Sequence, residues 1–225
     1  MRPKLLIIMV LCVMVNACTQ KSQNITSTLD EAFLGFEDTD KSPQEINALP
    51  YASSSVTIDD GAQLFIVLAL AEPSPADSKK IQLKWLSSDY AMLVTENGRL
   101  IKTLRLPTDN LANISTNDSV DPLHISGKKP NHHTWSAIYD WQPNYRFNYT
   151  AKLTWDFIAR ETIYSAVWKK EVDYYQEQVT IPALDVQFTN HFWLDKNSHQ
   201  VVKSIQHLGP EMPSVEMTIL KPFSG

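Results

Sequence analysis

From residue 54 to residue 220 the chain repeatedly alternates apolar and polar positions, as strands with one buried face do. Around residue 150, for example, Phe147, Tyr149 and Ala151 fall on one face, with polar residues between them. About ten to twelve such runs are separated by Pro, Asn, Asp and Ser, at spacings typical of barrels and sandwiches. Because closure removes exposed strand edges, the pattern predicts a mainly β, single antiparallel β-barrel-like or closed-sandwich domain over residues 53–225.

One stretch, Trp85 to Leu106, contains a strong turn signal at Asn97-Gly98 between two β-prone runs. A two-residue type I′ turn needs positive φ at both central residues, which asparagine tolerates and glycine adopts freely, so the stretch predicts a hairpin. A similar phrase, FWLDKNSHQVVKSI, places Asn197-Ser198 at the matching position. We therefore expect one hairpin design to occur twice, through a duplicated ancestry.

The N-terminus carries a second clear pattern: basic Arg2 and Lys4, an unbroken apolar run from Leu5 to Val15, and Cys18 shortly after it. The run is shorter than the roughly 20 residues that cross a bilayer as a helix, so a signal peptide over residues 1–17 is the better interpretation. The end of this segment resembles a bacterial lipobox. The resemblance implies that Cys18 carries a diacylglyceryl thioether and an amide-linked acyl chain, which together hold a protein firmly at a membrane.

The same region also predicts the membrane location of the protein and the state of its cysteines. Thr19 after Cys18, rather than aspartate, resembles the sorting pattern of outer-membrane lipoproteins, so we expect a periplasm-facing protein on the inner leaflet of the outer membrane. Cys12 would leave with the signal peptide and Cys18 would be lipidated. No disulfide is then expected, and a chain of this size can bury a core without one.

Residues 18–52 are predicted to form a lipidated tether followed by short helices. Capping signals begin at Ser27 and again at Ser42-Pro43-Gln44-Glu45, and the second helix must end before Pro50. Between them, Glu37 to Asp40 resembles half of a calcium loop but lacks its glycine and closing glutamate, so a solvated linker is the better interpretation.

Net charge narrows the choice of partner. Removal of Arg2 and Lys4 with the signal peptide leaves 18 basic and 25 acidic residues, which changes the net charge from −5 to −7. An acidic chain without clustered arginines has no electrostatic footprint for nucleic acid, so no nucleic-acid partner is expected.

A transmembrane barrel is the rival architecture, and charged residues argue against it. The outward faces of such a barrel should be apolar. Basic residues instead crowd the predicted strands: Lys84, Arg99, Lys102, Arg105, Lys169 and Lys170.

The stretch from Pro107 to Asn131 breaks the strand pattern, and we expect a long loop there with a short helical turn near Leu123. Loops of this length tend to be functional or mobile, so Asp121 and Leu123 are candidate contacts for a partner or a glycan. The alternative is an insertion without a function of its own.

The six tryptophans, 85, 135, 141, 155, 168 and 193, could stack on sugar rings or fill a barrel interior. Most lie in apolar runs and are expected in the core. Trp141 is the exception, because Asp140-Trp141-Gln142-Pro143 indicates a strand end where an exposed ring could contact a glycan.

No catalytic pattern stands out. The only adjacent histidines, His132 and His133, would point to opposite faces of a strand, and neither HExxH nor paired cysteines occur, so no metal site is expected. No GxSxG elbow or glycine-rich phosphate loop is present, and we expect neither a cofactor nor an enzyme. A glycosidase would need two carboxylates across a cleft, for which Asp140, Asp156 and Glu161 are the nominal candidates.

Several phrases occur together in a known family. They are Tyr51-Ala52-Ser53, WLSSDYAMLVTENGRLIKTLRL, Asp121-Pro122-Leu123, Asp140-Trp141-Gln142-Pro143 and FWLDKNSHQVVKSIQHLGPEMPSVEMTILKP. Over roughly residues 45 to 222 the chain resembles the YjbF/GfcB family of group 4 capsule polysaccharide lipoproteins.

The resemblance implies a lipid-anchored barrel-like domain that acts as a non-enzymatic accessory of exopolysaccharide or capsule secretion at the outer membrane. Its expected partners are polysaccharide export proteins of the outer membrane and periplasm, and the polysaccharide itself is a further candidate. The family has no catalytic residues to transfer to this chain. Two alternatives are a periplasmic glycan-binding module and a glycan-processing enzyme.

Overall fold

The computed structural model describes residues 41–106, 109–116, 119–142 and 146–224. These residues belong to one compact unit, Glu37–Gly225. The predicted signal peptide, Cys18 and the helix expected after Ser27 lie outside the described residues. In the part of the chain that is described, no helix has the length and apolar character needed to cross a membrane.

One antiparallel sheet of twelve strands makes up most of the unit, and strands that pair are consecutive in sequence except where β1 pairs with β12. The strands are β1 (Ser53–Ile58), β2 (Leu64–Pro73), β3 (Ile81–Leu86), β4 (Met92–Glu96), β5 (Arg99–Leu104), β6 (Asn110–Ser115), β7 (His132–Gln142), β8 (Arg146–Tyr164), β9 (Lys169–Ile181), β10 (Val186–Asp195), β11 (Val201–His207) and β12 (Ser214–Lys221). The described helical elements are α3 (Pro43–Ala48), η2 (Pro122–His124) and η3 (Pro182–Leu184). The mainly β prediction and its strand number are confirmed.

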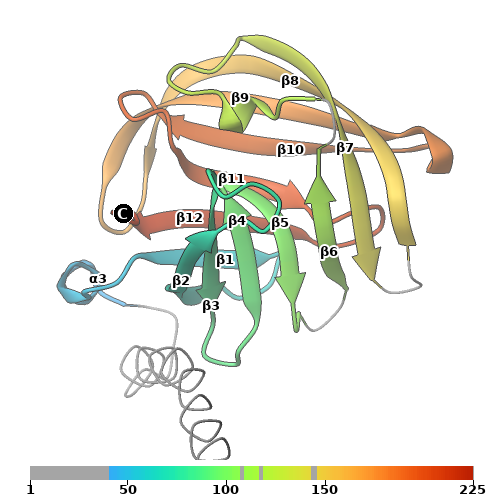
Figure 1. Cartoon of the computed structure of the whole chain (residues 1–225). Helices are drawn as coiled ribbons and strands as arrows, with labels where there is room; N and C mark the ends of the chain where they lie inside the picture. Colours follow the sequence, from blue (N-terminus) through green and yellow to red (C-terminus); the bar gives the residue numbers. More distant parts are fainter. Residues whose placement is uncertain (1–40, 107–108, 117–118, 143–145, 225) are drawn as a thin grey trace, which may run out of the picture. The chain divides into compact units, whose positions relative to one another are not determined.

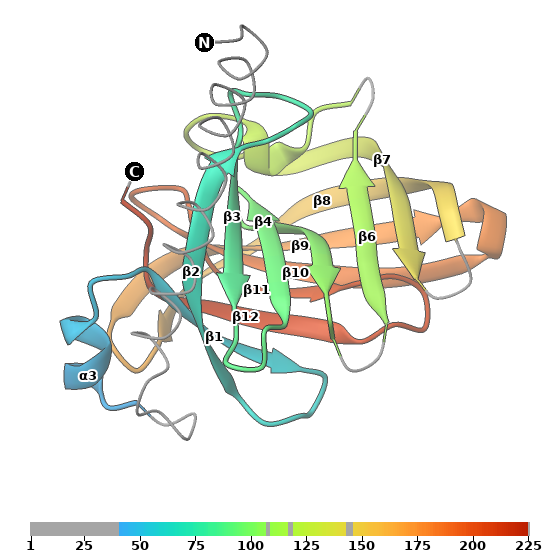
Figure 2. The same cartoon turned by 60° about the horizontal axis from the view of Figure 1, so that its bottom comes forward.

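The sheet bends back on itself into a nearly closed barrel, as predicted. Strands β2–β6 form one wall, and β8–β12 cross behind them at a large angle (Figure 1 and Figure 2). The two ends of the sheet, β5 and β6, lie side by side. Side chains bridge this seam: the amide of Leu111 donates to Thr103 Oγ1 (2.9 Å) and the amide of Leu106 to Asn110 Oδ1 (3.2 Å). Both sheet edges are thereby covered.

Large side chains fill the interior of the barrel. The largest fully buried ones are Trp85, Trp155, Arg99, Tyr139, Tyr175, Phe192, Leu111, Leu153, Ile181, Leu194, Leu208 and Glu177. At one end the rings of Trp155 and Tyr175 stack with centroids 4.7 Å apart. Interiors packed in this way gain stability from apolar burial, at about 25 cal/mol for each Å² removed from water.

The Asn97-Gly98 hairpin is confirmed, because these two residues connect β4 to β5 with φ of 47° and 88°. The matching turn connects β10 to β11, so Asn197 also lies in a strand connection, as predicted. Its geometry differs. Asp195 accepts from the amides of Asn197 (2.8 Å) and Ser198 (3.0 Å), and the positive φ falls on His199.

The two turns also meet in space. The side-chain amide of Gln206 donates to the carbonyl of Gly98 (3.0 Å), and its oxygen accepts from the amide of Leu100 (2.9 Å). A methyl group at Gly98 would lie only 2.4 Å from Val201 Cβ. Thus β11 directly supports the first turn, while a duplicated ancestry stays a prediction.

The second predicted helix is confirmed as α3. Ser42 accepts from the amide of Glu45 (3.3 Å), and Glu45 accepts from the amide of Ser42 (2.7 Å), which is the reciprocal capping box. The helix ends at Ala48, before Pro50.

Two expectations about segments were wrong. The stretch after Pro107 is not all loop, because β6 lies within it and pairs with β7, although η2 confirms the helical turn at Leu123. Phe147 is 50% exposed, whereas Ala151 is fully buried. Asn148 has a φ of 63°, so the backbone is irregular there and the period-two pattern fails at this end of β8.

Position 98 requires glycine for two reasons: its backbone has a positive φ, and Val201 leaves no room for a side chain. We expect Gly98→Ala to lower the free energy of unfolding by about 3 kcal/mol, since alanine with positive φ costs about 1 kcal/mol and the clash with Val201 adds to this cost. Gly127 also has positive φ (70°) but has open space around its Cβ position, so Gly127→Ala should cost about 1 kcal/mol. Urea unfolding of both variants measures the difference, and equal losses would contradict the packing argument.

The carboxylate of Asp195 should make the free energy of unfolding decrease at low pH. Burial opposes its charge, but hydrogen bonds from Lys170 (2.5 Å) and from the amides of Ser198 and Asn197 outweigh burial and lower its pKa to about 2, from an ordinary 3.8. A carboxylate with a lowered folded-state pKa stabilises the fold above pH 4, and this contribution is lost as pH falls from about 4 to about 2.

We therefore expect Asp195→Asn to remove about 2 kcal/mol of stability at pH 7 and to flatten the loss of stability between pH 4 and pH 2. Unfolding by denaturant at several pH values measures both effects. Asp60→Asn, at an exposed aspartate in the turn after β1, is the control and should keep the wild-type profile.

Candidate functional site

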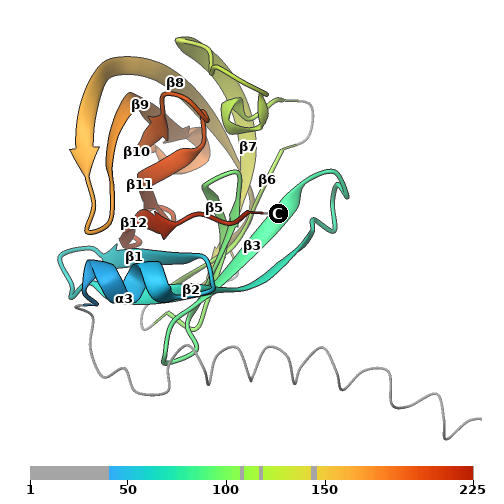
Figure 3. The same cartoon turned by 90° about the vertical axis from the view of Figure 1, so that its left-hand side faces the viewer.

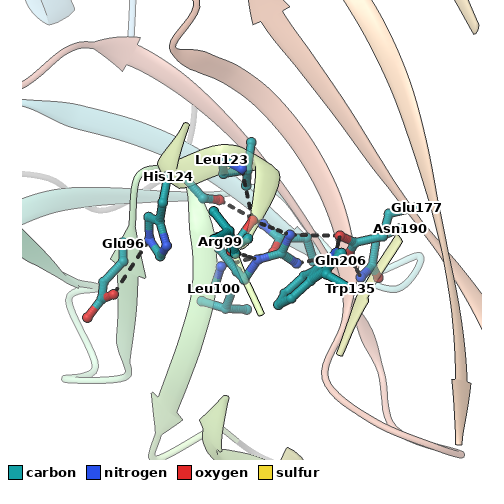
Figure 4. Close-up of polar contacts among 12 residues, drawn as sticks. Glu96, Arg99, Leu100, Leu123, His124, Trp135, Glu177, Asn190 and Gln206 are labelled. Atoms are coloured by element: carbon teal, nitrogen blue, oxygen red, sulfur yellow. Dashed lines mark hydrogen bonds and ion pairs between the residues drawn. The ribbon is translucent and has the colours of Figure 1, made fainter. Parts of the chain in front are cut away.

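A charged cluster lies inside one end of the barrel. Arg99, the first residue of β5, has a side chain that is 2% exposed. Its guanidinium lies between Asp121 and Glu177, and Figure 4 shows the side chain directed toward Glu177. It donates to Asp121 at 2.5 and 3.1 Å and to Glu177 at 2.7 and 2.8 Å, so both contacts are bidentate.

Aromatic and amide groups complete the surroundings of this cation. The guanidinium carbon lies 4.7 Å from the centroid of the Trp135 ring and 5.2 Å from that of Phe192. Glu177 accepts two further hydrogen bonds, from the indole of Trp135 (3.2 Å) and from the amide of Asn190 (3.1 Å). Every charge in the cluster is therefore paired and hydrogen-bonded, as burial requires.

Asp121 connects the cluster to the segment that precedes β7. Its carboxylate also accepts from the amide of Leu123 (2.9 Å) and so caps η2. Lys129 donates to the carbonyl of Leu123 (3.1 Å) and to that of Ile125, which folds the segment back on itself. Arg99 thus joins three parts of the chain: β5, residues 121–129 and β9.

The mutual pairing changes the acidity of these groups. Burial opposes the charge of Arg99, but Asp121 and Glu177 outweigh it and raise its pKa well above its ordinary value. Burial likewise opposes the charge of Asp121, and Arg99 outweighs it and lowers the pKa of that carboxyl. Both groups stay charged at neutral pH, so their contact acts as a structural clamp.

Two cavities lie on either side of residues 121–129. The larger, of about 400 Å³, is lined by both hairpin turns, by residues 123–129 and by the C-terminal segment after β12. The smaller, of about 220 Å³, reaches Arg99 from the side of β6. His124 lines both cavities, its Nε2 lies 3.7 Å from a carboxylate oxygen of Glu96, and burial lowers its pKa.

The predicted contact residues prove to be buried. Trp141 was expected at an exposed strand end, but it is 3% exposed and its ring packs against Tyr149 at 4.9 Å. The prediction of its exposure is wrong, because β7 continues through Gln142 and turns this ring inward. Asp121 and Leu123 are 2% and 3% exposed and hold the segment in place. Cys18 lies outside the described residues.

The nominal catalytic carboxylates each have a separate partner. Asp156 lies 2.6 Å from His132, Glu161 accepts from the indole of Trp193 (2.5 Å), and Asp140 accepts from the amide of Asn148 (2.7 Å). Over the described ranges, no three His, Cys, Asp or Glu side chains gather where a metal ion could bind.

Sequence reasoning missed the clamp, although one signal for it exists. Along β9, inward positions occur at every second residue: Tyr175, Glu177, Val179 and Ile181. A glutamate in this apolar series predicts a buried charge, which requires a partner. The partner itself is not visible in sequence, because Arg99 lies 78 residues away.

Comparison with known proteins gives the class of this barrel. The crystal structure of the hypothetical lipoprotein YmcC from Escherichia coli K12 is similar to it, with a TM-score of 0.76 and 33% identity, covering 89% of this chain and 97% of that one. The barrel is therefore a domain shared with a bacterial lipoprotein.

The sequence comparison is more specific. Residues 26–220 match the family described as group 4 capsule polysaccharide lipoprotein GfcB, YjbF. The chain is 34% identical to the uncharacterized lipoprotein GfcB of E. coli K12, covering 99% of each chain, and 29% identical to the lipoprotein YjbF, covering 98% of this chain and 97% of that one. The chain belongs to the YjbF family, as the resemblance predicted.

The clamp should dominate stability. We expect Arg99→Met to lower the free energy of unfolding by about 3–5 kcal/mol, because it leaves two buried carboxylates without their cation. Lys196→Met removes a similar pair with Glu171, but that pair is exposed (41% and 60%) and should cost less than about 1 kcal/mol. Chemical denaturation of both variants is the measurement, and similar losses would refute the structural role of the clamp.

Proposed function

We propose that this protein is a lipid-anchored, non-enzymatic accessory of exopolysaccharide or capsule secretion or assembly, held at the inner leaflet of the outer membrane and facing the periplasm. The observation that carries the proposal is the family match over residues 26–220, together with relatives named lipoproteins over nearly their full length. The lipobox-like end at Cys18 supports the anchor. Polysaccharide export proteins of the envelope are the proposed partners.

The packing of the interior supports an accessory rather than a channel or an enzyme. In the described part of the chain the centre of the barrel is occupied by Trp85, Trp155, Tyr139 and the Arg99 clamp. The three candidate carboxylates are bound to different partners on different strands. A role through contacts of the outer surface, carried to the membrane by a lipid, fits this arrangement best.

Deletion of the gene tests the proposal in the source bacterium. We expect loss of surface polymer, restored by the wild-type gene but not by Cys18→Ala, because that variant has no thiol to acylate. Cys12→Ala is the matched control, since Cys12 lies within the predicted signal peptide, and it should restore secretion.

Three measurements report the outcome: polymer extracted from the cell surface, incorporation of labelled palmitate, and the membrane fraction that holds the protein. Unchanged polymer in the deletion strain would refute the secretion role. Labelled palmitate on Cys18→Ala would refute the anchor.

A further inference from the structure

A continuous row of outward-facing side chains crosses six strands of the barrel. In register, each residue of the row stands directly opposite the next: Tyr174 (β9), Trp193 (β10), Lys203 (β11), Thr218 (β12), Ser55 (β1) and Phe65 (β2). Their neighbours along the strands, such as Phe192, Met217 and Ile66, are buried in the core. Strands lie about 4.8 Å apart, so the row extends over about 24 Å.

The part of this row from Lys203 to Phe65 forms the floor of a groove of about 400 Å³, and Tyr174 and Trp193 continue the row beyond its lining. Residues Tyr164 to Ala166, in the turn that connects β8 to β9, form one side, and α3 contributes Ile46 to the lining. Figure 3 shows β8 and β9 arching over toward β1 and β12. The indole of Trp168 donates to the carbonyl of Ile219 (2.8 Å), which fixes this turn against β12.

The floor of the groove is polar and nearly balanced in charge. Hydroxyl groups come from Ser55, Thr57 and Thr218, and Lys203 pairs with Glu216 at 2.8 Å. Such a floor offers both donors and acceptors of hydrogen bonds. It lacks the apolar centre that a stable protein interface or an acyl chain would need.

Aromatic rings lie at the wall and along the row. Tyr164 is 69% exposed and forms one side of the groove. Tyr174 and Trp193 stack with centroids 4.9 Å apart and planes inclined by 14°, and Lys203 Nζ lies 5.4 Å from the Trp193 ring. Flat aromatic surfaces beside hydrogen-bonding groups match a sugar ring, which has apolar C–H faces and hydroxyl groups around its edge.

We propose that this groove binds a segment of the secreted polysaccharide, several sugar residues long. The proposal rests on the proposed function for the identity of the polymer. Tyr164, which lines the groove, is the aromatic contact in place of the buried Trp141. The groove lies on the outer face, so the chain can bind polymer without opening the barrel.

Affinity electrophoresis tests the groove. The mature lipidated protein, in detergent, is run in native gels that contain increasing amounts of surface polysaccharide purified from the source bacterium. We expect the polymer to retard the wild type and Tyr164→Ala to weaken retention about tenfold, the loss typical of a central aromatic contact. Tyr90→Ala is the matched control, since Tyr90 is 51% exposed but lies in the turn between β3 and β4.

Both substitutions are neutral, so mobility in gels without polymer should not change. Thermal unfolding of both variants shows whether each folds like the wild type. Tyr164→Ala should fold normally, because its side chain is mostly exposed.

Two results of the gel experiment would overturn the proposal: no retardation of the wild type, or equal retention of Tyr164→Ala and Tyr90→Ala. A photo-crosslinker placed at position 164 gives a third test. Capture of an envelope protein, or of residues 19–40 of this chain, instead of polymer would also overturn it. None of these outcomes alters the gene-deletion result. If the deletion strain has a secretion defect but the protein does not bind polymer, the proposed function is retained and only the binding role of the groove is refuted.

Discussion

The guanidinium of Arg99 lies inside the barrel between Asp121 and Glu177, where an unpaired charge would cost several kcal/mol. This penalty means that β5, residues 121–129 and β9 must come together for the barrel to close. The ion pairs of Arg99 therefore hold β5 from inside the barrel. Thr103 connects the same strand to β6 at the edge of the sheet. The ion pairs of Arg99 contribute to closing the barrel and to holding the segment before β7. The Arg99 guanidinium also packs against Trp135.

The described interior of the barrel is filled by apolar side chains and paired charges. The same alternation along each strand that buries Phe192 and Met217 directs Trp193 and Thr218 outward. The chain belongs to a family of capsule polysaccharide lipoproteins, and the groove proposed to bind polymer lies on this outer surface. In the proposed binding mode the barrel is a support for contacts made on its outer face.

The two related hairpin phrases illustrate how similar sequences reach different local structures. Asn97-Gly98 forms a tight turn because glycine accepts a φ of 88°. At the second site serine replaces glycine, the connection is longer, and Asp195 organises it through backbone amides and Lys170. Their contact at the same end of the barrel places both turns beside the larger cavity.

Local physical chemistry determined much of this protein from its sequence alone. Period-two alternation identified the strands, Asn-Gly identified a turn, and the Ser42 box identified a helix start, because each depends on residues only a few positions apart. Only the tertiary structure decided the burial of Trp141 and Asp121, the clamp at Arg99, and the row across six strands. These features depend on contacts between residues that are tens of positions apart, and in some cases more than a hundred. A local sequence pattern does not determine the register between such distant strands.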